Sequence, residues 1–133
     1  MTKEAALYGF WASFGLPAYD EASVPTGDNA PKFPYITYQV STSDFGDPVA
    51  LSASLWYRST SWVDANAKAQ EVGKMIGRGG VTLHYDGGAM WIKRGSPFAQ
   101  SMGDPSDNLV SGHSDGQIKR KIINIEAEFI SAD

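Results

Sequence analysis

The sequence contains no cysteine, which excludes disulfide bonds, thiolate chemistry and zinc sites built from cysteine. It has no run of about 18 consecutive apolar residues, so we expect no transmembrane helix. Residues 1–4 carry an early acid and lack the pattern of a signal peptide. Basic residues are fewer than acidic ones. The sequence has 11 Lys and Arg against 15 Asp and Glu, which gives a formal net charge of −4. Phosphate contacts supply most of the affinity for nucleic acid, so this balance argues against sequence-independent DNA or RNA binding.

What the sequence does have is a globular composition of one-domain size. Its 133 residues are 42% hydrophobic and 20% charged, which is typical of a folded chain and not of a disordered one. A chain of this length buries roughly two-thirds of its unfolded surface. We therefore expect a single domain over residues 1–133.

Two segments have the periodicity of amphipathic helices. In the first, large apolar residues recur at i, i+3, i+4 and i+7, after a possible cap at Thr2 and before Gly15; they are Leu7, Phe10, Trp11 and Phe14. In the second, Ser61 and Asp64 fit a capping box ahead of an apolar series that ends at the glycines of 77–80; that series is Trp62, Ala65, Ala69, Val72 and Ile76.

The strand signals are five alternating or β-branched segments. They cover residues 35–42, 49–59, 81–85, 89–92 and 117–131. Turn residues at 43–48 and 86–88 predict two hairpins. In the segment 49–59, Leu51 and Leu55 share a core face, whereas Trp56 lies among polar residues on the other. The predicted fold is α+β, with the order α-β-β-α-β-β-β and both helices on one face of an antiparallel sheet.

Two long segments between these elements read as irregular. Residues 17–34 contain four prolines, and residues 95–116 combine two prolines with several Gly, Ser and Asp. Loops of this length without their own structure are usually functional or mobile. We interpret both as candidate interaction arms.

No motif predicts catalysis. The sequence has no G-x-S-x-G elbow and no P-loop, and the glycines of 77–80 follow a helix instead of preceding one. Two His–Asp pairs, His84 with Asp86 and His113 with Asp115, offer a metal or acid–base site only if the fold brings them together. We read the basic run 119–121 as an edge-protecting or interface patch. We expect no enzyme activity, no cofactor and no metal.

The aromatic content is high, with four Trp, six Tyr and six Phe. Aromatic residues, Met and Arg are enriched in the cores of protein interfaces. We therefore predict that one set of such residues forms a subunit or partner interface. It comprises Trp56, Arg58, Trp91, Arg94, Phe98 and Met102.

The order of elements and several strings resemble the tail-terminator (tail-completion, minor tail) proteins of long-tailed bacteriophages and prophages. The similarity is one of overall pattern and covers nearly the whole chain. It is carried by Phe10-Trp11, Tyr19-Asp20-Glu21, 34–38, 55–58, the Trp62 helix, 87–92, 94–98 and 120–129.

This resemblance implies an α+β fold and a structural role in the virion. Proteins of this family form a ring, commonly a hexamer, that ends tail-tube polymerisation and joins the tail to the head connector. The implied partners are further copies of the chain, the tube protein and the connector protein, with DNA passing through unbound and no membrane involved. The implied location is the virion tail or neck, with assembly in the host cytoplasm.

An acidic lumen would let DNA pass without sticking. The candidate lumen residues are Asp104, Asp107, Glu126 and Glu128. Two alternatives stay open. One is another neck, connector or tail-tube subunit, and the other is a small metal- or ligand-binding module or enzyme that uses the His–Asp pairs.

Overall fold

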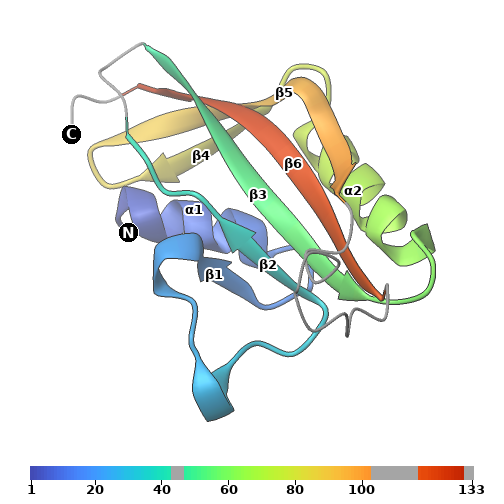
Figure 1. Cartoon of the computed structure of the whole chain (residues 1–133). Coiled ribbons are helices and arrows are strands. Elements are labelled where there is room, and N and C mark those ends of the chain that lie inside the picture. The colour runs from blue at the N-terminus through green and yellow to red at the C-terminus, as the bar shows by residue number, and fades with distance from the viewer. Residues whose placement is uncertain (43–46, 103–116, 131–133) are drawn as a thin grey trace.

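The computed structural model describes residues 1–42, 47–102 and 117–130. Within these ranges, two α-helices, two short 3-10 turns and six strands form one layered unit (Figure 1). In chain order the elements are α1 (Lys3–Ala12), β1 (Ala18–Asp20), η1 (Glu21–Ser23), η2 (Gly27–Asn29), β2 (Tyr35–Tyr38), β3 (Pro48–Arg58), α2 (Val63–Ile76), β4 (Val81–Tyr85), β5 (Gly88–Met102) and β6 (Ile118–Phe129). Neither of the two helices in the described part of the chain is long and apolar enough to cross a membrane.

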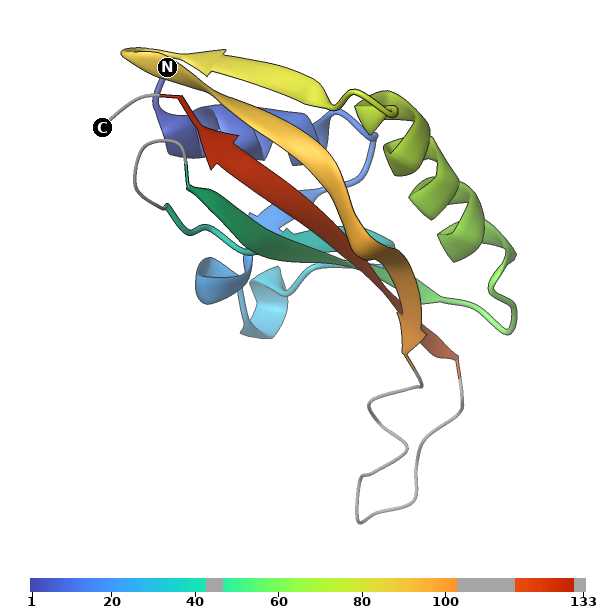
Figure 2. The same cartoon turned by 90° about the horizontal axis from the view of Figure 1, so that it is seen from above.

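The predicted α+β class is confirmed, and the sheet is a single strongly curled one (Figures 1 and 2). Its strand order is β1-β2-β3-β6-β5-β4. All neighbours are antiparallel except β1 and β2, which pair in parallel. The expectation of a wholly antiparallel sheet is therefore wrong at this one edge. The three residues after Pro17 run beside β2, and the Pro17 carbonyl accepts a 2.8 Å hydrogen bond from the Ile36 amide.

The candidate arm 95–116 is not irregular at its start, because β5 continues to Met102. The sequence there contains Pro97, which cannot donate to a sheet and so predicts a loop. The strand accommodates it in a bulge, where the register against β6 shifts between Arg94 and Ala99. The rest of this arm, 103–116, lies outside the described residues. In the other arm, β1, η1 and η2 occupy part of 17–34.

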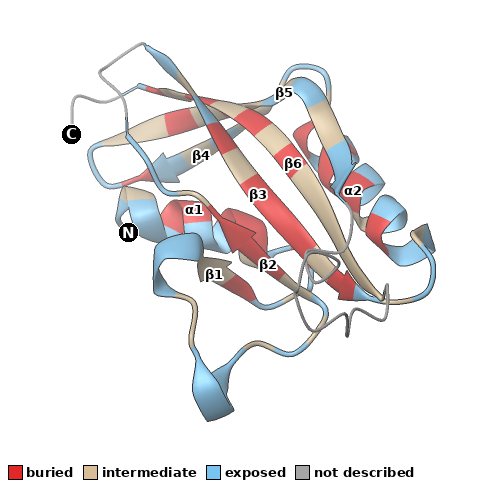
Figure 3. Cartoon of the chain, in the orientation of Figure 1, coloured by how far each residue is buried: buried red, intermediate tan, exposed pale blue. Residues whose placement is uncertain are grey.

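Both helices pack on the same face of the sheet, as predicted, and share one core with it. We call this the inner face and the opposite one the outer face. The Thr2 hydroxyl caps α1 by accepting from the Ala5 amide, as predicted. The capping box expected from Ser61 and Asp64 does not form, because Trp62 is the N-cap residue of α2 and its side chain makes no capping hydrogen bond. The Ser61 hydroxyl accepts from the Val63 amide at 3.1 Å just before the helix. The inner faces of the strands and the apolar faces of both helices merge into one core (Figure 3). Its fully buried side chains include Trp11, Ile36, Leu55, Val72, Ile76, Met90, Ile92, Ile123 and Ile125.

Candidate functional site

The outer face of the sheet carries a row of large side chains on four adjacent strands. Register pairs Tyr35 with Trp56, Trp56 with Arg120 and Arg120 with Met102. Directly paired residues of neighbouring strands point to the same side of a sheet. Tyr19 of β1 joins the end of this row, with its ring centroid 6.2 Å from that of Tyr35. We call these five residues the outer aromatic row.

The outer aromatic row is held by specific contacts. The rings of Tyr35 and Trp56 stack with centroids 6.1 Å apart and planes 15° apart. The Arg120 guanidinium lies 4.9 Å from the Trp56 ring and donates through Nε to the Ser54 hydroxyl at 3.0 Å. The Trp56 indole Nε1 donates to the Thr37 hydroxyl at 2.9 Å. The outer aromatic row is therefore a surface of fixed geometry. Partial burial raises the pKa of the Tyr35 hydroxyl above its ordinary value of 10.0.

At the other end of the same face lie two acids. Register sets Glu128 opposite Trp91 and Glu126 opposite Lys93. The Lys93 ammonium is 3.7 Å from the Glu126 carboxylate and 4.5 Å from the Trp91 ring. The outer face thus carries the outer aromatic row at one end, and both candidate lumen acids at the other end together with Trp91 and Lys93.

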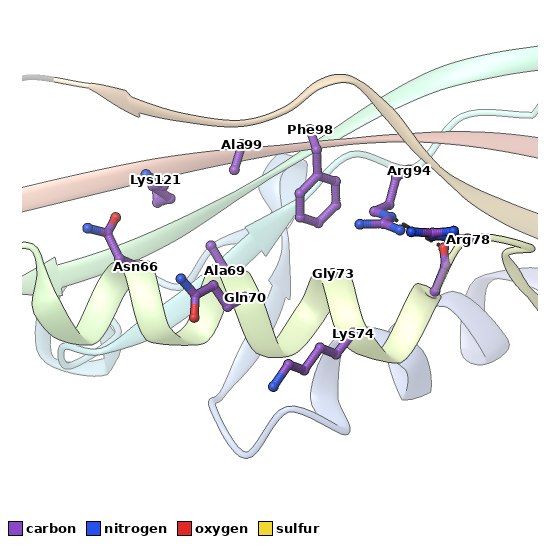
Figure 4. Close-up of a pocket in the computed structure, with 11 residues that line it drawn as sticks. Asn66, Ala69, Gln70, Gly73, Lys74, Arg78, Arg94, Phe98, Ala99 and Lys121 are labelled. Carbon is purple, nitrogen blue, oxygen red and sulfur yellow. Dashed lines mark hydrogen bonds between the residues drawn. The ribbon is translucent and has the colours of Figure 1, made fainter.

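A second candidate surface is a groove between α2 and the strands β5 and β6 (Figure 4). It encloses about 620 Å³ and contains four cationic residues and no acid among its described lining residues. We call it the α2 groove. Its lining is Asn66, Ala69, Gln70, Gly73, Lys74, Gly77, Arg78, Arg94, Phe98, Ala99 and Lys121.

The α2 groove has an apolar floor and a charged rim. The Phe98 ring lies on Gly73, where an added Cβ would stand 3.2 Å from the ring edge. Arg94 donates through Nε to the Gly77 carbonyl at 3.3 Å, which places it beside Arg78 at one end. Lys121 lies at the other end, where its ammonium donates to the Ser101 hydroxyl at 2.9 Å. The Lys74 side chain points away from Phe98 (Figure 4).

The six predicted interface residues therefore divide between two surfaces. Trp56 and Met102 belong to the outer aromatic row, and Arg58 lies exposed at the end of the same strand face. Trp91 is on the outer face near the acids, and its indole Nε1 also donates to the Gly79 carbonyl at 2.8 Å. Arg94 and Phe98 instead line the α2 groove.

The other predicted residues fall as follows. Glu126 and Glu128 are half-buried on the outer face, whereas Asp104 and Asp107 lie outside the described residues. His84 is exposed on β4, and Asp86 pairs with the N-terminal ammonium of Met1.

His113 and Asp115 also lie outside the described residues. Within residues 1–42, 47–102 and 117–130, no three His, Asp or Glu side chains cluster as metal ligands would. The interpretation of 119–121 as edge protection is wrong, because β6 is an interior strand between β3 and β5.

Sequence reasoning missed the α2 groove as a unit. Its cations come from a helix end, from β5 and from β6, and no local pattern joins these segments. The signal available in the sequence was that Asp86 is the single acid between Glu71 and Asp104, a stretch that contains Arg78 and Arg94.

No protein-family model matches the sequence, and no curated protein matches it. Among solved structures, the fold is similar to that of one chain in a structure described as "Virion of native gene transfer agent (GTA) particle". The two chains share 19% identity and superpose with a TM-score of 0.61. The match covers 96% of this chain and 93% of that one. At this identity the likeness establishes a shared fold.

Proposed function

We propose that this protein is a structural subunit of a phage-like virion, and specifically a tail terminator that closes into a ring on the end of the tail tube. The observation that supports it best is the fold match to a chain of a gene transfer agent virion, which extends over 96% of the sequence. The pattern resemblance to tail-terminator proteins gives the finer assignment. In this proposal the partners are further copies of the chain, the tube protein and the head connector.

The two surfaces support a role in assembly. The outer aromatic row and the α2 groove lie on different sides of the sheet, so a partner that covers one leaves the other free. Contacts between unlike surfaces of identical subunits are heterologous, and they close into a ring when the rotation per subunit divides a full turn. In this proposal Glu126 and Glu128 face the channel through which DNA passes, where their charge repels phosphate.

The native mass over a concentration series, measured by light scattering after size exclusion, tests the proposal. A closed ring of about six copies of the 14.4 kDa chain has a mass of about 86 kDa that does not grow with concentration. Negative-stain images should show a ring with a central opening. Added to polymerising tube protein from the same phage, the ring should bind tube ends and stop elongation.

Other outcomes would favour other assignments. Open-ended growth of this chain alone would favour a tube subunit. A ring that binds the connector but not tube ends would favour another neck protein. A strict monomer that neither binds nor caps tubes would overturn the proposal, and a rise in melting temperature with a divalent metal would then favour the metal-binding alternative.

A further inference from the structure

We infer that the α2 groove binds an acidic turn of a second copy of this chain, formed by residues 20–30, and that this contact joins neighbouring subunits. We call residues 20–30 the acidic turn. This inference rests on the proposed function, because it names the contact by which the ring closes.

The positive charges that line the α2 groove favour an anionic occupant. Within the described residues, Arg78, Arg94 and Lys121 have no carboxylate within ion-pair distance. Arg78 and Arg94 gather at one end, where two like charges repel each other unless an anion sits between them. A guanidinium pair of this kind is suited to carboxylates, which it can bind through two parallel hydrogen bonds.

The apolar floor of the α2 groove also favours an occupant with apolar side chains. Phe98, Ala69 and Ala99 line it, and its volume of about 620 Å³ is in the range (~300–1,000 Å³) of sites that enclose a small ligand. The occupant should therefore combine carboxylates with small apolar side chains. An extended polyanion such as DNA lacks the second property, and the net charge of −4 on the chain opposes its approach.

The acidic turn has both properties. It carries Asp20, Glu21 and Asp28 without a basic residue, and its small apolar side chains are Ala22, Val24, Pro25 and Ala30. Neither 3-10 turn within it buries a residue. The segment projects from the body of the molecule as an exposed loop (Figures 1 and 3).

Within one chain the acidic turn and the α2 groove do not meet. Both views place η1 and η2 on the side of the molecule away from α2 (Figures 1 and 2). The turn of one copy is therefore free to enter the groove of the next. Such a contact is head-to-tail, and every subunit offers one turn and one groove, which is the arrangement that a ring requires.

The absence of cysteine allows a clean cross-linking test. Two single-cysteine variants of the full chain, Asn29→Cys and Gln70→Cys, are mixed and oxidised with copper phenanthroline. Asn29 is exposed in the acidic turn, and its replacement keeps all three acids of that turn. Because each chain carries one thiol, every disulfide between unlike variants joins two copies. Met75→Cys is the matched control, since Met75 is on the same helix but is exposed and does not line the groove.

The inference predicts that Asn29→Cys forms a disulfide-linked dimer with Gln70→Cys at least about fivefold faster than with Met75→Cys. Equal rates for both partners, or no dimer with either, would overturn it. The wild-type mass from light scattering separates the two proposals. A ring without this cross-link overturns the contact and leaves the terminator, whereas a strict monomer that does not cap tubes overturns both.

A charge exchange provides a second readout. Arg78→Glu and Asp28→Arg should each raise the dissociation constant of the assembly at least about tenfold, and the double variant should return most of that loss. Melting temperatures near that of the wild type show that each variant is folded. Failure of the double variant to recover the wild-type mass would overturn the pairing. If Arg78→Glu leaves the mass unchanged but weakens binding of a labelled DNA oligonucleotide, the groove binds nucleic acid and the inference is overturned.

Discussion

Trp91 and Gly80 approach each other so closely that a side chain at Gly80 has no room. A Cβ added there would stand 2.4 Å from the Trp91 indole Nε1 and 2.6 Å from the Ile92 carbonyl oxygen. The φ of Gly80 is also +81°, a backbone conformation that favours glycine. The same indole nitrogen donates to the Gly79 carbonyl, so Trp91 anchors the chain between α2 and β4.

We therefore expect Gly80→Ala to lower the free energy of unfolding by about 2–4 kcal/mol, because left-handed backbone strain and an overpacked contact add together. Urea unfolding followed by circular dichroism measures the loss. Gly79→Ala is the matched control, since no atom lies within 4 Å of its added Cβ. That control should stay within about 0.5 kcal/mol of the wild type. Equal losses for the two variants would contradict the close approach.

Lys68 ties the two helices together. Its ammonium donates to the Phe14 carbonyl just after α1 at 2.7 Å and lies 3.1 Å from the Glu71 carboxylate. We expect Lys68→Met to lower the free energy of unfolding by about 1–2 kcal/mol, because the carbonyl loses a charged donor in a half-buried place. Glu71→Gln removes the exposed ion pair but keeps the hydrogen bond from Lys68 to the Phe14 carbonyl. It should lower the free energy of unfolding by less than about 0.5 kcal/mol. A larger loss for Glu71→Gln than for Lys68→Met would show that the ion pair matters more.

The elements with strong local signals could be predicted from the sequence. Helical spacing predicted both α1 and α2 correctly. The signal for α1 was the spacing of Leu7, Phe10 and Trp11, and the signal for α2 was the apolar series from Ala65 to Ile76. The alternation in 49–59 marks β3, with Leu51 and Leu55 on the core side. Each of these signals arises from residues close together in the chain, and burial on one face is enough to produce it.

The features that sequence reasoning missed depend on partners far along the chain. The strand β1 has three residues, and only its pairing with β2 defines it. The strand β5 passes Pro97 because a bulge against β6 leaves that position out of register, and the Asn124 side-chain amide donates to the Pro97 carbonyl at 2.9 Å. The α2 groove depends in the same way on Arg94 and Lys121 meeting one helix. Local propensity contains no information on such contacts.

A buried tyrosine makes the stability sensitive to alkaline pH. Burial raises the pKa of Tyr57 above its ordinary value of 10.0, and the negative charges of Asp64 and Glu71 raise it further. The unfolded chain releases this proton near pH 10 and the folded chain only at higher pH, so stability falls as the pH rises above about 10. Tyr57→Phe has no such proton and should lose less stability between pH 9 and pH 11. Melting temperatures across this window measure the difference, with the exposed Tyr8→Phe as the control for removal of a hydroxyl. Identical slopes for Tyr57→Phe and the wild type would show that Tyr57 does not contribute.

The placement of Glu126 and Glu128 on the outer face allows the proposed lumen to be tested directly. Replacement of both by Lys changes the local charge by four units per subunit, because each Glu→Lys exchange replaces one negative charge by one positive charge. The two new cations join Lys93 and Arg120, which already lie on that face. If this face lines the channel, assembled rings of Glu126→Lys/Glu128→Lys should bind a DNA duplex at low salt, and the affinity should fall steeply as salt increases, because counterions are released from the phosphates. Wild-type rings should show no such binding. The control is Glu4→Lys/Asp64→Lys, which changes the charge by the same amount at exposed positions on the two helices, away from that face and outside the acidic turn and the α2 groove. Fluorescence anisotropy of a labelled duplex measures all three proteins, and equal affinity for both double variants would place the two acids outside the channel.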